Sequence, residues 1–212
     1  MTMFFNKIGK TLLVILSIAF ASNVAYKFYN KKKRKERSEI NEVIMFSSGG
    51  SNLKQSKYTR FQISNSMDRL LHYLNSPRSS IDICMYVITS QDFANVILKL
   101  HIRGIKVRVI MDADMAFTSG SVIKRFHKYK IPLRWMKSTY LMHHKFCLID
   151  TMDDVEKKSM PLVIMGSLNW TNQALNGNWE DVVVTSQKDL VRQYKTEFER
   201  LWLQFKPIVD LT

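Results

Sequence analysis

A short segment near the middle of the chain combines a histidine, a lysine and an aspartate at fixed spacing. Residues 142–150 read MHHKFCLID, so His143, Lys145 and Asp150 fit the pattern H-x-K-x4-D. Alone, this pattern would arise by chance in roughly one chain in forty of this length, at about one in twenty per fixed residue. An imidazole is a nucleophile and a fixed ammonium group attracts anionic oxygens, so the pair suits chemistry at a phosphate.

A second polar element follows after another apolar stretch. Gly166, Ser167 and Asn169 form a G-S-x-N sequence, which lowers the probability of coincidence by a further factor of roughly a few hundred. Glycine lets backbone N–H groups approach an anion, and Ser and Asn add hydrogen-bond donors. A helix that begins near Thr171 would direct its positive end to the same place. Together the two elements predict a phosphate-binding site.

Strand alternation decides which of these side chains can act together. The apolar run 145–150 is predicted to be a β-strand. Side chains alternate between the two faces of a strand, so His143 and Lys145 share one face and His144 points to the other. We therefore expect His144 to be structural.

The remaining pattern alternates between strands and helices. Apolar runs predict strands over 43–46, 81–88, 107–111, 133–136, 145–150, 162–165 and 182–185. Helical spacing and capping residues predict helices over 63–74, 91–103, 119–130 and 188–205. Such alternation with apolar strands indicates the α/β class, with a mixed β-sheet flanked by helices.

The N-terminal region differs from the rest in composition. Residues 11–26 carry no charge, and lysines precede and follow them. We predict a short segment over 1–10, a transmembrane anchor over 11–28, a basic linker over 29–41 and a catalytic domain over 42–212. A cleaved secretory signal, with Ala19-Phe20-Ala21 as its processing site, and a buried core helix are the alternatives.

The net charge indicates the class of binding partner, and the cysteines indicate the cellular compartment. The net charge of +14 favours nucleic acid or acidic lipid headgroups, with a merely solubilising surface as the alternative. Four basic residues are candidates for a nucleic-acid groove, although a solvated face suits each equally: Arg108, Lys124, Arg134 and Lys137. Cys84 and Cys147 lie in apolar runs, which indicates buried thiols in a reducing compartment.

The two polar elements resemble the signature of the phospholipase D superfamily. Within it, the segments MHHKFCLID and MGSLNWTNQALNGNWEDV are similar to Zucchini, the mitochondrial cardiolipin hydrolase and piRNA-pathway endonuclease family. The resemblance extends from about Glu42 to the C-terminus, and the predicted anchor matches as well. It implies a phospholipase D-like fold and a membrane-anchored phosphodiesterase.

The resemblance also implies roles for the site residues. His143 would attack phosphorus and form a phosphohistidine intermediate. A second histidine would protonate the leaving oxygen, and the single motif here implies that a second subunit supplies it across a homodimer interface. Lys145, Ser167 and Asn169 would bind the phosphate oxygens.

Two carboxylates complete the implied set. Glu180 matches the carboxylate that orients the catalytic histidine in this superfamily. Asp150 completes the motif and so stands among the catalytic candidates, although its place at the end of a strand predicts a structural role. No cofactor is needed, because lysine and histidine supply positive charge. Some relatives carry a zinc finger, but residues 42–74 hold no cysteine and one histidine, His72, so zinc is not predicted.

The resemblance leaves three functions open. The first is an endoribonuclease for single-stranded RNA in primary piRNA biogenesis, which silences transposons in the germline. The second is a phospholipase D that hydrolyses cardiolipin to phosphatidate. The third is a non-catalytic membrane tether for piRNA factors. The implied location is the mitochondrial outer membrane, with a single span and the catalytic domain in the cytosol. The long gap between Asp150 and Gly166 predicts an exposed inserted loop at about 151–160.

Overall fold

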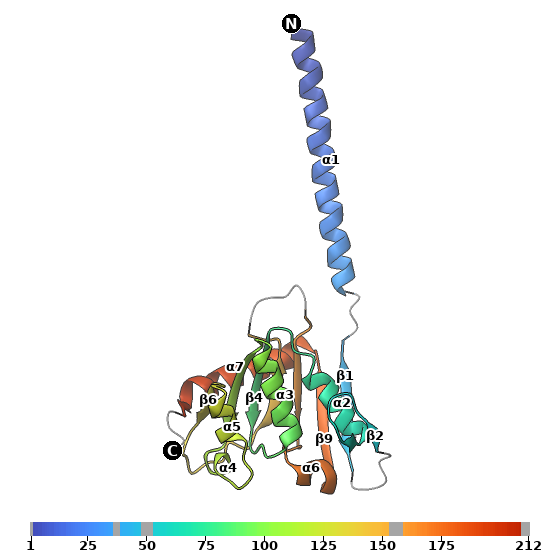
Figure 1. Cartoon of the computed structure of the whole chain (residues 1–212). Coiled ribbons are helices and arrows are strands. Elements are labelled where there is room, and N and C mark those ends of the chain that lie inside the picture. The colour runs from blue at the N-terminus through green and yellow to red at the C-terminus, as the bar shows by residue number, and fades with distance from the viewer. Residues whose placement is uncertain (1, 36–38, 48–52, 153–158, 209–212) are drawn as a thin grey trace. The chain divides into compact units, whose positions relative to one another are not determined.

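The chain divides into two units, which are described separately. The computed structural model describes residues 2–35, 39–47, 53–152 and 159–208, and the boundary between the two units follows Glu39. The first unit contains a single helix, α1 (Thr2–Lys35), and the second unit, Ile40–Thr212, contains all the other elements (Figure 1). Most of the predicted loop at 151–160 lies outside the described residues.

Helix α1 is continuous through the predicted short segment, the predicted anchor and the first part of the predicted linker. Its described side chains are largely exposed, among them Leu13, Ile15 and Phe20. Within the described residues, no helix combines the length and the apolar character needed to cross a membrane. The transmembrane anchor at 11–28 therefore stays a prediction.

The second unit is built on a mixed sheet of eight strands. In sheet order the strands are β1 (Asn41–Phe46), β9 (Glu180–Thr185), β8 (Leu162–Gly166), β7 (Lys145–Ile149), β4 (Ser80–Met85), β5 (Lys106–Met111), β6 (Leu133–Trp135) and β10 (Lys206–Pro207). Strands β4, β5 and β6 are parallel, and the other pairs are antiparallel. This confirms the predicted α/β architecture with a mixed sheet.

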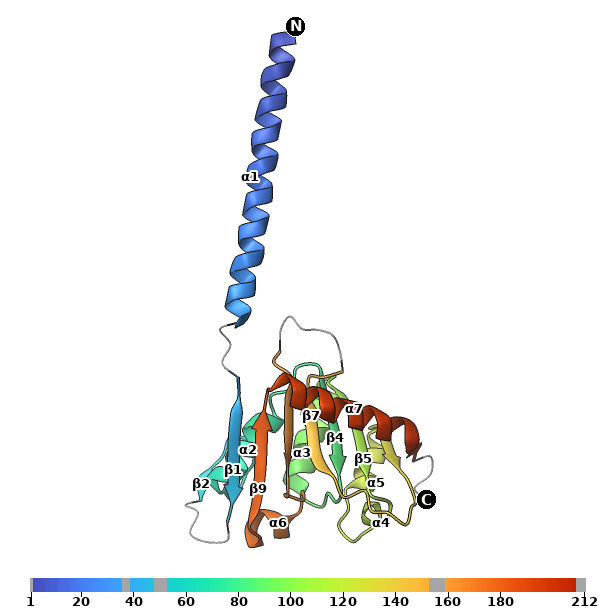
Figure 2. The ribbon, with the colours of Figure 1, turned by 180° about the vertical axis from the view of Figure 1, so that it is seen from behind.

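Helices cover both faces of the sheet. The elements outside the sheet are a small hairpin, β2 (Lys54–Gln55) with β3 (Gln62–Ile63), and the helices α2 (Asn65–Leu74), α3 (Gln91–Ile102), α4 (Ala113–Ala116), α5 (Ile123–Lys128), α6 (Asn172–Gly177) and α7 (Lys188–Gln204). Helices α2 and α3 lie on one face, and α7 crosses the opposite face (Figures 1 and 2). The predicted helix at 119–130 is shorter than expected: it covers Ile123–Lys128, with Val122 and Tyr129 at its cap positions.

Strand β7 lies at the centre of the sheet, between β4 and β8. Its alternation divides its side chains between two apolar clusters. Phe146 and Leu148 join α7 residues on one face, and Cys147 and Ile149 join α2 and α3 residues on the other. Burying such a strand on both faces removes its apolar area from water, which is the main force that holds it in place. The buried strand therefore fixes the polar residues that precede it and those that follow it at its two opposite ends.

Candidate functional site

His143 and Lys145 come together where β7 begins. The Lys145 ammonium nitrogen lies 3.3 Å from each ring nitrogen of His143 and donates to the His143 carbonyl at 3.0 Å. His143 is exposed and Lys145 is half-buried. An accessible imidazole thus stands directly beside a positive charge, which is the arrangement needed to bind and attack a phosphodiester.

Tyr86 supports this pair, although sequence reasoning missed it. Its ring meets the His143 ring edge-on at a centroid distance of 4.7 Å, and the Lys145 ammonium lies 5.4 Å from the Tyr86 ring centroid. The Tyr86 backbone N–H donates to the carbonyl of His144 at 2.9 Å. Tyr86 follows β4, which pairs with β7. Its position at the end of an apolar strand was the only signal in the sequence.

The environment of Lys145 lowers its pKa below the ordinary value. Burial is the main cause, because a charged group loses hydration when it is partly enclosed, and the nearby Glu180 carboxylate acts in the opposite direction. Lys145 also lines a shallow opening together with Gly166 and Trp170. Lys145 and the G-S-x-N element are therefore neighbours, because Gly166 and Leu168 line the same opening.

The G-S-x-N element is fixed by an unusually close approach of two strands. A Cβ atom on Gly166 would lie 2.1 Å from the carbonyl oxygen of Asp181, so only glycine fits there. The Ser167 N–H donates to that carbonyl at 3.1 Å, and the Asp181 N–H donates to Ser167 Oγ at 3.1 Å. The Ser167 hydroxyl in turn donates to Glu180. This register sets the serine beside the carboxylate.

Glu180 is held by two polar partners. Besides Ser167, the side-chain amide of Asn178 donates to Glu180 Oε1 at 2.8 Å. Asn178 was not predicted, and its place two residues before Glu180 gives no distinctive pattern. No hydrogen bond between Glu180 and His143 is present in the described part of the chain, so its predicted orienting role stays a prediction.

Asn169 contributes a buried polar atom with no partner. Its side-chain oxygen Oδ1 is shielded from solvent and makes no hydrogen bond among the described residues. A buried acceptor without a donor lowers the stability of the fold.

The helix that follows Asn169, α6, begins at Asn172, and the Thr171 hydroxyl already accepts from the Ala174 N–H at 3.1 Å. One of the predicted anion-binding N–H groups at this helix is therefore occupied by its own cap.

Asp150 lies at the other end of β7 and does not belong with this pair. Its carboxylate is buried and accepts from the backbone N–H groups of Arg78, Ser79 and Ser80 at 2.8–3.2 Å, and from the Ser79 hydroxyl at 3.1 Å. Its backbone has a positive φ of 56°. The catalytic candidacy of Asp150 is corrected: this carboxylate holds the start of β4 against the end of β7.

His144 faces away from the pair, as strand alternation predicts. Its ring lies 3.3 Å from the Glu197 carboxylate on α7 and packs edge-on against Phe146. His144 is thus part of the contact between the sheet and α7.

Two of the four groove candidates also serve the fold. Arg108 pairs with Asp82 and Glu199, and Arg134 stacks over Trp202. Their charges are engaged on the α7 side of the sheet. Lys124 and Lys137 are exposed.

The described residues contain no group of three or more His, Cys, Asp or Glu side chains that could hold a metal ion. Between β1 and α2, where no zinc site was predicted, polar contacts join the β2–β3 hairpin to α2. Lys54 pairs with Asp68 at 2.8 Å, and the Ser56 hydroxyl donates to Asp68 at 2.6 Å.

Comparison with known proteins defines the class first. The family described as "Cardiolipin synthase, PLD-like domain" matches residues 70–202. The fold is similar to Nuc from Salmonella typhimurium, a phospholipase D family member (TM-score 0.65, 20% identity, 82% of this chain and 100% of that chain). It is also similar to NucT from Helicobacter pylori (TM-score 0.62, 23% identity, 81% and 100%). The class is that of the phospholipase D-type hydrolases.

Sequence relatives place the chain more narrowly. The mitochondrial cardiolipin hydrolase of Drosophila melanogaster is 31% identical over 228 residues, covering 93% of this chain and 90% of that protein. The proteins of the same name from Chlamydomonas reinhardtii and Homo sapiens are 40% and 37% identical, covering 66% and 68% of this chain. The chain spans 59% and 53% of these two relatives. It belongs to the mitochondrial cardiolipin hydrolase (Zucchini) family.

Proposed function

We propose that this chain is a phosphodiesterase in which His143 attacks phosphorus. The observation that carries the proposal is the exposed His143 imidazole with the Lys145 ammonium 3.3 Å from its ring nitrogens. The ammonium attracts the substrate phosphate and stabilises the charge that develops on its oxygens during attack. Asn169 is proposed to bind the same oxygens. Ser167 is proposed to do so by turning its hydroxyl from Glu180 to the substrate, while Asn178 continues to hold Glu180.

The reaction has two displacement steps. A ring nitrogen of His143 forms a bond to phosphorus, the ester P–O bond breaks, and the leaving oxygen takes a proton. Water then attacks the phosphohistidine, the P–N bond breaks and a phosphomonoester leaves. A general acid must supply the first proton and accept one from water in the second step.

We propose that the general acid is His143 of a second copy. The chain contains one H-x-K motif, and the described residues place no other imidazole beside His143. A homodimer with a two-fold axis near the site would bring two identical half-sites together. Glu180, held by Ser167 and Asn178, is proposed to orient the imidazole in that assembly.

Cardiolipin is the first candidate substrate. The relatives that match this chain bear the name mitochondrial cardiolipin hydrolase, which favours lipid over the RNA substrate that the sequence alone placed first. Hydrolysis at one phosphodiester of cardiolipin gives phosphatidate and phosphatidylglycerol. The proposed setting is the mitochondrial outer membrane, with 11–28 as a single-pass anchor and the second unit in the cytosol.

Single-stranded RNA is the second candidate, with a role in piRNA production. The net charge of +14 favours it, and RNA offers the same phosphodiester chemistry. A purely tethering role is disfavoured, because His143, Lys145 and Glu180 have no folding reason to stay together at an exposed site.

A parallel assay tests both candidates. The full chain, reconstituted in vesicles, is given labelled cardiolipin and, separately, a labelled unstructured RNA. His143→Asn serves as the inactive control and His144→Asn as its matched neighbour. We expect phosphatidate release by the wild type and by His144→Asn but not by His143→Asn. Cleavage of RNA without phosphatidate release would replace the lipid substrate by RNA, and no cleavage of either would contradict the proposed function.

A further inference from the structure

Hydrogen bonds at three levels link helix α3 and the α5 segment. The Val122 N–H, just before α5, donates to the carbonyl of Ile88, which precedes α3. Further along, Arg125 on α5 donates to the side chain of Asn95 on α3. Near the other end, the His101 ring lies 3.0 Å from the Tyr129 carbonyl. These three hydrogen bonds hold the α5 segment alongside α3.

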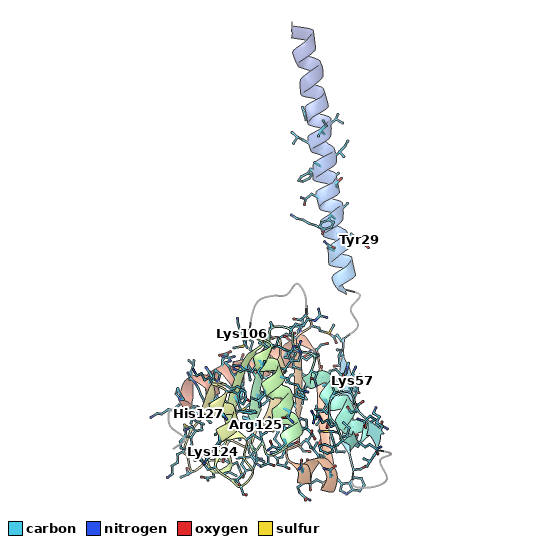
Figure 3. The ribbon with its side chains drawn as sticks, viewed as in Figure 1. Tyr29, Lys57, Lys106, Lys124, Arg125 and His127 are labelled. Carbon is cyan, nitrogen blue, oxygen red and sulfur yellow. The ribbon has the colours of Figure 1, made fainter. Side chains whose placement is uncertain are left out.

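This surface is strongly basic. The two helices with their flanking residues, 91–103 and 122–130, contain six Lys or Arg and one acidic residue, Asp92. One stripe of α3 exposes Lys99 and is continued by Arg103, and α5 exposes Lys124 and Lys128. We call the following set the α3–α5 basic face: Lys99, Arg103, Lys124, Arg125, Lys128 and Lys130. Arg125 and Lys124 project from α5 beside α3 in Figure 3.

The charges of this face are not neutralised by its polar partners. The Arg125 guanidinium donates to Gln91 at 2.9 Å and Asn95 at 2.7 Å, both of which are uncharged. The ion pairs in the described part of the chain include no member of the face. In contrast, Arg108 is engaged by Asp82 and Glu199 behind the sheet. The face therefore presents a net positive field to solvent.

We propose that the α3–α5 basic face docks on the anionic headgroups of a lipid bilayer. The face consists of exposed and half-buried side chains of two neighbouring helices and of the residues that directly follow them. A broad helical surface matches a bilayer, whereas a single strand of RNA needs a groove and stacking platforms. Ile102 is 69% exposed and Tyr129 44% exposed within the face. An apolar and an aromatic side chain among lysines are typical of the membrane interface.

The inference does not rest on the proposed catalysis, because docking is a binding property. It predicts that the second unit lies against anionic membranes with α3 and α5 facing the lipid. Such contact would hold the domain at the membrane surface by electrostatic attraction. At 0.1 M salt this attraction is screened over a distance of about 10 Å.

A local fluorescence measurement tests it. In the full chain, Ile102→Cys carries an environment-sensitive dye, and the native thiols do not compete because Cys84 and Cys147 are buried. The chain is reconstituted in vesicles with nitroxide-labelled lipid, containing either phosphatidylcholine alone or added cardiolipin. We expect quenching of the dye with the anionic vesicles, little with the neutral ones, and loss of quenching at about 0.5 M salt, where screening is stronger.

Matched variants decide whether the face is responsible. Replacing Lys99, Lys124 and Lys128 by glutamine should lower the ratio of docked to undocked domain about a hundredfold. The control replaces Lys188, Arg192 and Lys195 on α7 by glutamine, which removes the same charge and should preserve quenching. Equal quenching in neutral vesicles, or equal loss in both triple variants, would overturn the proposal. Unchanged quenching together with lost binding of a labelled RNA by the first variant would also overturn it and assign the face to nucleic acid.

Discussion

The polar groups at the two ends of strand β7 lie in opposite environments. At one end, Asp150 is buried and its carboxylate accepts from three backbone N–H groups and a hydroxyl. At the other end, His143 is exposed and stands beside Lys145, which is partly stripped of water. A carboxylate whose oxygens already accept hydrogen bonds from the protein stabilises the fold. An imidazole that keeps access to solvent beside a cation remains available for a substrate.

The largest expected effect is on turnover at the exposed end. His143→Asn should lower kcat by at least about a thousandfold, because it removes the nucleophile on which both displacement steps depend. His144→Asn, one residue away and on the other face, should retain activity. Turnover assays on folded protein, with circular dichroism as the folding control, make the measurement. Retained turnover in His143→Asn would erase the contrast between the two ends.

The next largest effect is on stability at the buried end. Asp150→Ala leaves several backbone donors unsatisfied and places alanine at a φ of 56°, so it should lower the free energy of unfolding by about 3 kcal/mol. Asp150→Asn should cost less, because asparagine still accepts and tolerates this backbone conformation. Denaturant titration gives the unfolding free energies. A large loss of kcat in stable, folded Asp150→Asn would return Asp150 to the chemistry.

A third prediction uses the pKa of Lys145, which burial lowers. Catalysis needs the protonated ammonium, so activity should be present below its pKa and fall as pH rises through it. The basic limb of the pH profile should therefore have its midpoint below about 10.4, the value of an ordinary lysine. Lys145→Arg should remove this limb while keeping part of the activity, because arginine stays charged. An identical basic limb in Lys145→Arg would assign it to another group.

The smallest expected effect concerns the neighbour that faces α7. His144 and Glu197 form a partly exposed pair at 3.3 Å. Such pairs contribute less than about 1 kcal/mol. His144→Ala should therefore change the midpoint of thermal unfolding by a few degrees at most and leave kcat within about twofold of the wild type. A loss of activity as deep as that of His143→Asn would mean that the alternation of faces misassigns the two histidines.

Local sequence patterns predicted much of the site, because the alternation of side chains in a strand is a local property. The spacing of His143, His144 and Lys145 predicted which face each side chain takes. The contact of Lys145 with His143 and the contact of His144 with Glu197 on α7 confirm it. The strands and most helices were likewise predicted, since apolar periodicity reports burial.

Interactions that depend on sheet pairing could not be predicted. Tyr86 meets the His143 ring only because β4 is the neighbour of β7, and nothing in either segment specifies that order. The N–H groups that donate hydrogen bonds to the Asp150 carboxylate belong to residues about 70 positions earlier in the chain. The engagement of Arg108 by Asp82 and Glu199 similarly needs β4, β5 and α7 together. Long-range packing decides which charged residues remain free.

In the proposed mechanism His143 becomes covalently phosphorylated, and trapping the adduct tests this step most directly. The full chain is mixed with a phosphodiester labelled in its phosphoryl group, quenched within one turnover under alkaline conditions that preserve phosphohistidine, and mapped by peptide mass spectrometry. We expect label on His143, retained in His144→Asn and absent in His143→Asn. Label on His144 or another residue, or full turnover with no adduct at any time point, would contradict it.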